Sequence, residues 1–214
     1  GVTDWDITTT GFTGHASGVF GQALGYGANY ELARILDAFQ RELPEPNLTI
    51  NVGLMVGGTP ASLEPGGARG NAAGKTNIVA AQAAARGDLR TLTPEQDARA
   101  KAKMQAIVAA HLPKTDATLV FEEPYPPMAP TAGNRALLAL LNQVNADLGL
   151  PTMGEWDPAK RGAADSSFVA ADADVVDPRR VAGVLDVGDD VGDRRARTRR
   201  ATTPGEKRLP RLQV

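Results

Sequence analysis

The sequence predicts an α+β fold, in which two helices cover one face of a four-stranded antiparallel sheet. Three observations carry this prediction: four stretches with strand character, two amphipathic helical stretches, and their order β-α-β-β-α-β within residues 1–126 of the 214. That order is the split, ferredoxin-like βαββαβ arrangement. The hydrophobic content of 42% suffices for a core, and because only 5% of residues are aromatic, Ala, Val and Leu must fill most of it.

The first two elements are a strand and a helix. Residues 2–10 alternate between two faces, which indicates a strand. The glycine-rich stretch 11–27 is too loose for a regular element. Asn29 is expected to cap a helix that runs to about Glu42, because apolar residues recur there at helical spacing. Pro44 ends this helix.

Two strands follow, with a long connection between them. Residues 48–56 are rich in β-branched side chains, and Gly57-Gly58 closes this second strand. Residues 58–75 have the Gly, Pro and Ala content of a loop. Residues 77–92 are expected to form the third strand, with alanine-rich packing.

A strong start signal opens the second helix. Thr93-Pro94-Glu95-Gln96 is a capping box with proline at the first helical position. The helix is expected to reach about His111, and residues 115–123 form the fourth strand. The expected buried residues of this helix are Ala98, Met104, Ile107, Val108 and Leu112.

The pattern changes after this unit. Residues 134–148 form an amphipathic helix stopped by Gly149, and a glycine-alanine turn follows at residues 162–165. From residue 172 onward the chain has no aromatic residue, no Ile and no Met, while Arg and Asp are frequent. Such a segment buries too little apolar surface to offset its ordering entropy, so residues 172–214 are expected to be disordered.

The composition excludes several classes of protein. A net charge of −2 argues against a general nucleic-acid binder, and the absence of cysteine excludes disulfides and thiolate metal sites. No apolar run of about 18 residues is present, so no membrane span is expected. The chain begins at Gly1 inside a predicted strand. We therefore expect a fragment of a longer protein, cytoplasmic rather than exported, with the compartment itself left open.

Three polar side chains near predicted strand ends are the candidate site residues: His15, Asn77 and Arg90. An imidazole, a carboxamide and a guanidinium offer donors that match carbonyl and carboxylate oxygens. Small residues flank His15, so a ligand can approach it closely. The second histidine, His111, is better explained as a favourable charge at a helix C-terminus. Two histidines and no cysteine give no convincing catalytic centre, and no metal ligand is predicted.

Two other motifs favour structural explanations. The Gly74-Lys75-Thr76 loop is similar to a phosphate-binding loop, but Arg69 occupies the position that requires glycine, and no buried strand precedes it. A flexible surface loop is the favoured interpretation, and nucleotide binding is kept as the lesser alternative. The carboxylate pair Glu122-Glu123 could suggest acid–base chemistry, but solvated charges at a strand end explain it better.

Several motifs in order carry a resemblance to a known family. They are Gly14-His15-Ala16-Ser17, Asn51-Val52-Gly53, Gly57-Gly58-Thr59, Thr76-Asn77-Ile78-Val79 and Asp88-Leu89-Arg90. Together they resemble the lid, or dimerisation, domain of the co-catalytic zinc metallopeptidases, which include glutamate carboxypeptidase, aminoacylase and succinyl-diaminopimelate desuccinylase. The turn at residues 162–167 is similar to one in the catalytic domain of that family.

The resemblance implies an enzyme with two zinc ions that hydrolyses an amide bond next to a free carboxylate, in a small peptide or an N-acyl amino acid. His15 would stabilise the oxyanion, in that family often by reaching across a dimer. Asn77 and Arg90 would bind the substrate, as would Gly162 and Asp165. A homodimer through the lid sheet is expected, with no nucleic-acid or membrane partner.

Departures from the family pattern limit what this chain is expected to do. The first metal-binding motif of the family precedes the lid, so it would lie before Gly1. The last zinc-binding histidine of the family follows the turn at residues 162–165, but this chain has no histidine after His111. We therefore expect a lid at residues 1–126, a truncated segment of an α/β catalytic domain at 127–171, and a disordered or frame-shifted tail at 172–214. Such a fragment would bind substrate and dimerise but be inactive alone, with no zinc of its own. A purely non-catalytic dimerisation module is the alternative.

Overall fold

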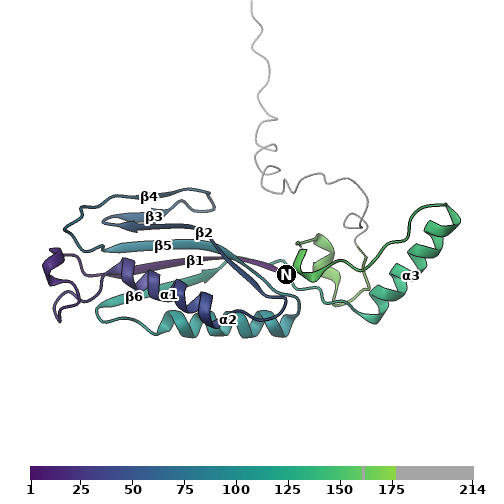
Figure 1. Ribbon diagram of the computed structural model, residues 1–214, viewed down its shortest axis with the longest axis horizontal. Helices are drawn as coiled ribbons and strands as arrows, with labels where there is room; N and C mark the ends of the chain where they lie inside the picture. Colours follow the sequence, from purple (N-terminus) through teal and green to yellow (C-terminus); the bar gives the residue numbers. More distant parts are fainter. Residues whose placement is uncertain (161, 177–214) are drawn as a thin grey trace, which may run out of the picture. The chain divides into compact units, whose positions relative to one another are not determined.

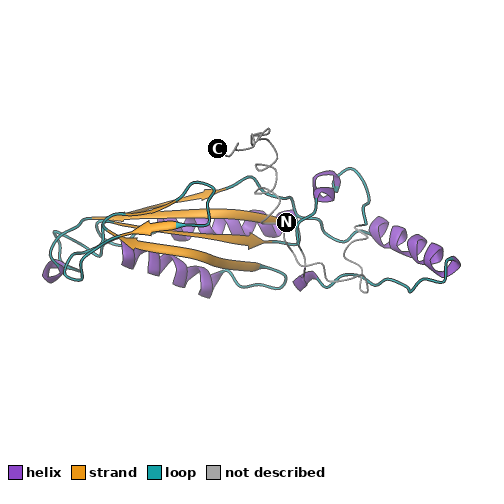
Figure 2. Ribbon diagram, turned by 90° about the horizontal axis from the view of Figure 1, so that it is seen from above, coloured by secondary structure: helices purple, strands orange, loops and turns teal. Residues whose placement is uncertain are grey.

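The computed structural model describes residues 1–160 and 162–176, and it contains the expected four-stranded antiparallel sheet. In spatial order the strands are β2 (Thr49–Gly58), β5 (Gln82–Arg90), β1 (Val2–Gly11) and β6 (Thr115–Phe121). Two helices, α1 (Ala28–Glu42) and α2 (Pro94–Ala109), lie on the same side of this sheet (Figures 1 and 2). The predicted α+β, ferredoxin-like fold is therefore confirmed.

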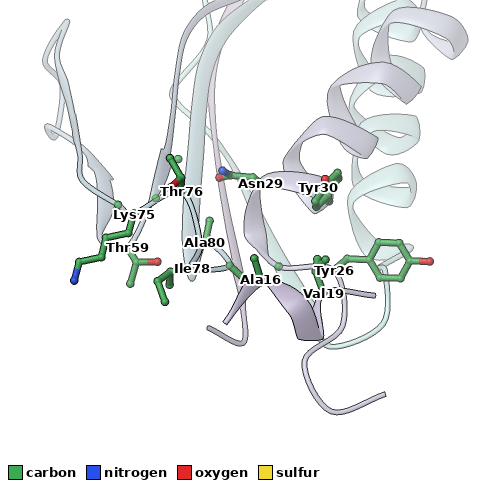
Figure 3. A pocket seen from close by; sticks show the side chains of 15 residues that line it. Ala16, Val19, Tyr26, Asn29, Tyr30, Thr59, Lys75, Thr76, Ile78 and Ala80 are labelled. Carbon is green, nitrogen blue, oxygen red and sulfur yellow. The ribbon is translucent and has the colours of Figure 1, made fainter. Parts of the chain in front are cut away.

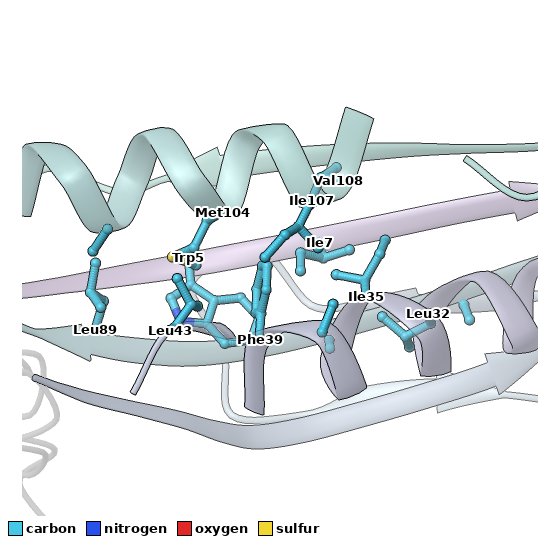
Figure 4. Packing of buried hydrophobic residues seen from close by; sticks show 14 of the residues in the cluster. Trp5, Ile7, Leu32, Ile35, Phe39, Leu43, Leu89, Met104, Ile107 and Val108 are labelled. Carbon is cyan, nitrogen blue, oxygen red and sulfur yellow. The ribbon is translucent and has the colours of Figure 1, made fainter. Parts of the chain in front are cut away.

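The core lies between this sheet and the two helices (Figure 4). Trp5 of β1 is fully buried and meets the ring of Phe39 edge-on, with the ring centroids 5.8 Å apart. Met104 of α2 is equally buried. Gly87 of β5 lies beneath the Trp5 ring, where a Cβ atom would overlap the indole. The small residues of β5 therefore make room for the large side chains of β1 and the helices.

The N-terminus of α1 differs from the prediction. Gly27, with a φ of 74°, is the N-cap, and no side chain caps the helix. Asn29 lies instead within the first turn, and its carboxamide occupies the space where a side chain on Gly57 would have to be. The expectation that Asn29 caps the helix was wrong, because this carboxamide is placed by its contact with β2 and not by the helix end.

The expected loop at residues 58–75 contains a small hairpin of β3 (Ala61–Leu63) and β4 (Gly70–Ala72). The hairpin lies on the side of the sheet opposite to the helices (Figure 1). Arg86 of β5 holds it by donating to the carbonyl oxygens of Glu64 and Gly67. The same guanidinium is fixed by Asp6, with Nε 2.7 Å from Oδ1 and Nη2 2.6 Å from Oδ2. The sequence did not predict this hairpin, because a strand of three residues is too short to show a recognisable alternation of apolar and polar side chains.

The connection into α2 follows the predicted capping box. Thr93 Oγ1 accepts a hydrogen bond from the Gln96 N–H at 3.2 Å, and Pro94 is the first helical residue. Gln96 Oε1 accepts from the N–H of Leu92 at 2.8 Å, one residue before the usual partner. The helix ends at Ala109, and the buried residues include Ala100 in place of Ala98.

The second part of the described chain follows β6. Its main element, α3 (Ala132–Asp147), is capped by Thr131 and ends before Gly149, which has a φ of 70°. Two 3-10 turns follow, η2 (Pro158–Lys160) and η3 (Asp165–Val169). No helix in the described ranges is both long and apolar enough to cross a bilayer. The boundaries at 126 and 171 stay predictions, and most of the predicted tail lies outside the described residues.

Candidate functional site

His15 lies on an exposed turn between β1 and α1. It is the N-cap of the short 3-10 turn η1 (Ala16–Gly18). Its Nδ1 accepts a hydrogen bond from the backbone N–H of Ser17 at 3.2 Å, and Ser17 Oγ lies 2.9 Å from the same nitrogen. The other ring nitrogen, Nε2, therefore carries the proton in the neutral ring and is the group that can donate to a ligand.

The structure brings Asn77 next to His15, although the two are far apart in sequence. The N–H of Ala16 donates to the carbonyl oxygen of Asn77 at 2.8 Å, and the N–H of Val79 donates to Gly14 at 2.9 Å. This isolated bridge ties the His15 turn to the segment before β5. Asn77 was expected within a strand that began at this residue, but β5 begins at Gln82, and Asn77 lies in an exposed turn. Residues 77–79 are bonded to the His15 turn and precede the strand.

A shallow pocket of about 300 Å³ adjoins this pair (Figure 3). Tyr30 of α1, Ile78 and Thr76 contribute to its lining, and Lys75 lies at its outer side with the ammonium directed away from the other labelled side chains. The Lys75 loop leads into strand β5 and not into a helix. A phosphate-binding loop requires a helix N-terminus at this point, so the geometry does not support nucleotide binding.

Arg90 lies at the opposite end of the sheet from His15 and Asn77. It is the last residue of β5, opposite Val2 and Thr49 in the neighbouring strands. Eight residue steps separate it from Gln82 at the other end of β5, which corresponds to roughly 27 Å. Within one chain, Arg90 is therefore too far from His15 to contact the same small substrate.

The surroundings of Arg90 are strongly charged. Its Nε donates to Asp88 Oδ2 at 2.7 Å, which orients the guanidinium on the face of the sheet without helices. The pKa of Asp4 on the neighbouring strand is raised by partial desolvation and by the charges of Glu122 and Asp88. Arg86 and Arg90 act in the opposite direction. Glu122 and Glu123 are both exposed.

The remaining candidates belong to the second part of the chain. Gly162 is half-buried in an irregular stretch, and Asp165 is the exposed first residue of η3. Their assignment as substrate-binding residues, like that of His15, Asn77 and Arg90, stays a prediction.

The described residues do not fit a metal centre. Across residues 1–160 and 162–176, no group of three or more His, Cys, Asp or Glu side chains lies together in a way that could hold a metal ion. His111, in the turn between α2 and β6, lies near two carboxylates, with Nδ1 3.7 Å from Glu31 of α1 and Nε2 3.4 Å from Asp116 of β6.

Ser17 and Asp88 belong to the motifs of the sequence, but their roles as partners of His15 and Arg90 were not found from it. Ser17 bonds to the imidazole of His15, and Asp88 holds the guanidinium of Arg90. Both lie two residues from the group that they contact. In a strand this spacing places Asp88 and Arg90 on the same face, so the alternation of β5 could have identified Asp88. The bond from Ser17 depends on the turn after His15, which no periodicity reveals.

A family model described as "Peptidase dimerisation domain" matches residues 1–116, and no curated protein matches the chain. A putative aminohydrolase from methicillin-resistant Staphylococcus aureus is similar in structure, with a TM-score of 0.58 and 16% identity over 80% of this chain and 40% of that one. A tripeptidase from Staphylococcus aureus gives a TM-score of 0.53 and 19% identity over 71% of this chain and 36% of that one.

A third similar structure is an aminobenzoyl-glutamate utilization protein from Klebsiella pneumoniae. Its TM-score is 0.54, with 19% identity over 79% of this chain and 39% of that one. These likenesses show a shared fold. The chain spans well under half of the length of each of these three structures.

Proposed function

The chain belongs to the peptidase dimerisation domain family of the M20 peptidases, and from this premise we propose that it supplies the substrate-binding and dimer-forming part of a hydrolase. The proposed reaction is cleavage of an amide bond next to a free carboxylate, in a small peptide or an N-acyl amino acid. The observation that carries the proposal is the family match over residues 1–116, which includes both helices and strands β1 to β5.

Strand β2 is the edge through which a second copy would pair. It is ten residues long and contains no charged residue and no proline, and Val52 and Met55 are exposed on it. The other edge, β6, carries Asp116 and is followed by Glu122-Glu123-Pro124. Charges and proline protect edge strands from pairing, whereas a long, uncharged edge favours it. We therefore propose a two-fold dimer in which β2 pairs with β2 of the partner.

This dimer would bring the separated site residues together. A two-fold axis through β2 makes the two strands antiparallel, so the Gly58 end of one chain lies beside the Thr49 end of its partner. Gly58 pairs with the start of β5, and Thr49 pairs with Arg90. Three strand spacings, about 14 Å, then separate Arg90 from the start of the partner's β5. One substrate would be held by Arg90 of one chain and by His15 and Asn77 of the other.

The donors of this chain suit that substrate. The Arg90 guanidinium can hold a planar carboxylate by two parallel hydrogen bonds. His15 Nε2–H and the Asn77 carboxamide can donate to the carbonyl oxygen and, more strongly, to the negative charge that develops on it during hydrolysis. We propose that the metal ions implied by the resemblance, two zinc ions, are held by other segments of the hydrolase. The chemistry assigned to this chain is that of its donors alone.

The non-catalytic dimerisation module stays as a second candidate, because the described residues hold no metal-binding group. Zinc content separates it from a complete enzyme. After the full chain is loaded with zinc and desalted, less than one ion per chain is expected. About two tightly held ions per chain would contradict the assignment of the metal site to other segments.

Cross-linking tests the shared site, because the chain has no cysteine of its own. In the full-length double variant Gln82→Cys/Arg90→Cys, a thiol cross-linker that reaches about 14 Å should join two chains into a covalent dimer, because this is the separation of Arg90 from the partner's first β5 residue. Each single variant is the matched control, since the proposed axis places equivalent residues of the two chains at opposite ends. Covalent dimers from the single variants, or a monomer by light scattering, would refute the arrangement.

A further inference from the structure

We propose that Ser17 is a positioning residue, which fixes the tautomer of His15 so that Nε2–H faces the ligand. The catalytic use of this tautomer rests on the proposed function. The preference for the tautomer itself does not, because it follows from contacts within the turn at residues 14–18.

The hydrogen bond between Ser17 and His15 has only one possible direction. A backbone N–H can only donate, so the 3.2 Å contact from the Ser17 N–H makes His15 Nδ1 an acceptor. An unprotonated Nδ1 requires the proton of the neutral ring to be on Nε2. The Ser17 hydroxyl lies 2.9 Å from the same nitrogen and can donate to it as well. Both donors of one residue therefore favour the same tautomer.

The donor also has a fixed position. The N–H of Gly18 donates to the carbonyl of His15 at 3.0 Å, and Val19 donates to Ala16 at 3.2 Å, which closes the η1 turn around Ser17. Ala16 is bonded to Asn77 at 2.8 Å. The imidazole thus takes the N-cap position that Ser, Thr, Asp or Asn usually fills. The turn that fixes the tautomer is therefore bonded directly to the segment that contains Asn77.

The tautomer has a consequence for hydrolysis. In the Nε2–H tautomer, the nitrogen remote from the turn is a donor, as an oxyanion requires. In the other tautomer, the same nitrogen would present a lone pair to that negative charge. Selection of the tautomer before substrate binds removes one reorganisation from the reaction, and the sequence signal for it is a serine two residues after His15.

The tautomer can be measured by nitrogen NMR on the full chain. The chain has two histidines, so His111→Gln assigns the His15 signals. The ratio of Nε2–H to Nδ1–H tautomers is expected to exceed that of the urea-unfolded chain by about fivefold, which is the ratio one ordinary hydrogen bond supports. Ser17→Ala should lower the ratio, Ser17→Thr should restore it, and Ser17→Pro, which removes the N–H, should reduce it to the unfolded value.

Two results would overturn the inference. One is a wild-type ratio equal to that of the unfolded chain. The other is a ratio unchanged in both Ser17→Ala and Ser17→Pro, with a native methyl spectrum showing that the variants fold. The cross-linking experiment fails or succeeds independently of these ratios. An altered ratio in the Ser17 variants without covalent dimers would therefore support the role of Ser17 and refute only the proposed dimer.

Discussion

Replacing Glu31 by Gln should destabilise the fold through one fully buried carboxylate. Glu31 lies in the first turn of α1 and has no exposed surface. Its Oε1 is 2.5 Å from Arg34 Nη2. Its Oε2 accepts from the Leu112 N–H at 2.9 Å and from Thr115 Oγ1 at 3.1 Å. One carboxylate thus joins α1 to the turn between α2 and β6.

The geometry sets the size of the effect. Glutamine has one acceptor oxygen, so its NH₂ group must face either Arg34 or the two donors on the α2–β6 turn. Removal of one partner from a fully buried ion pair costs about 3–5 kcal/mol. Because the Arg34 side chain keeps 24% of its exposure, water can solvate it after the change. We therefore expect Glu31→Gln to lower the free energy of unfolding by about 2–3 kcal/mol, less than for a fully buried pair.

The pH dependence of stability gives a second readout. Burial raises the pKa of Glu31, but hydrogen bonds from Arg34 and Leu112 and the charge of Arg34 outweigh it, so that the pKa is lowered on folding. A lowered pKa contributes stability that is present above the unfolded value of about 4.5 and is lost as the pH falls through the folded value. The free energy of unfolding of the wild type, measured with urea, should therefore decrease below about pH 4.5. The part of this decrease that comes from Glu31 should be absent in Glu31→Gln.

The control is Glu42→Gln, at the exposed end of the same helix. It should change the free energy of unfolding by less than about 0.5 kcal/mol. Equal stability of Glu31→Gln and wild type at neutral pH would refute the argument. So would a variant that keeps the full acid dependence below about pH 4.5.

Three further predictions concern the edge strand, the hairpin and the packing of the sheet. Met55→Lys should raise the dimer dissociation constant at least about tenfold, because it places two like charges near the proposed two-fold axis. A light-scattering dilution series measures this constant, and Val120→Lys on β6 should leave it unchanged. Arg86→Met should cost about 1–3 kcal/mol and speed amide exchange in residues 61–72; unchanged exchange would show that other contacts hold the hairpin. Gly87→Ala should cost more than about 3 kcal/mol in thermal unfolding, because the added Cβ would lie 1.9 Å from the Asn51 carbonyl oxygen and 2.4 Å from the Trp5 ring. A neutral effect would mean that the β2 backbone and the indole can both move.

The regular elements could be predicted because their signals are local. Alternation along residues 2–10, helical spacing in α1 and the capping box before α2 each depend on residues close in sequence. The role of Asn29 was predicted wrongly because its carboxamide packs against Gly57, which belongs to β2 and is distant in sequence. The hairpin was missed because three residues per strand contain too little alternation to recognise.

The candidate site was only partly accessible for the same reason. His15 and Asn77 were chosen for their chemistry, and their proximity depends on a bridge between residues 15 and 78 that no local pattern contains. The separation of Arg90 from Asn77 is part of the strand prediction itself, because the two residues lie near opposite ends of the predicted strand 77–92. What sequence cannot supply is the partner chain that would bring the two ends together.

The placement of His15 and Arg90 at opposite ends of one strand has a genetic consequence. In the proposed dimer, each substrate site draws His15 from one chain and Arg90 from the other. A hydrolase chain defective at His15 and one defective at Arg90 would each be inactive alone, since both sites of either homodimer lack a group. Their heterodimer would contain one complete site and one site lacking both groups. When two such alleles of a single gene are expressed equally, random pairing makes half of the dimers heterodimers with one complete site each, so about a quarter of the activity should return.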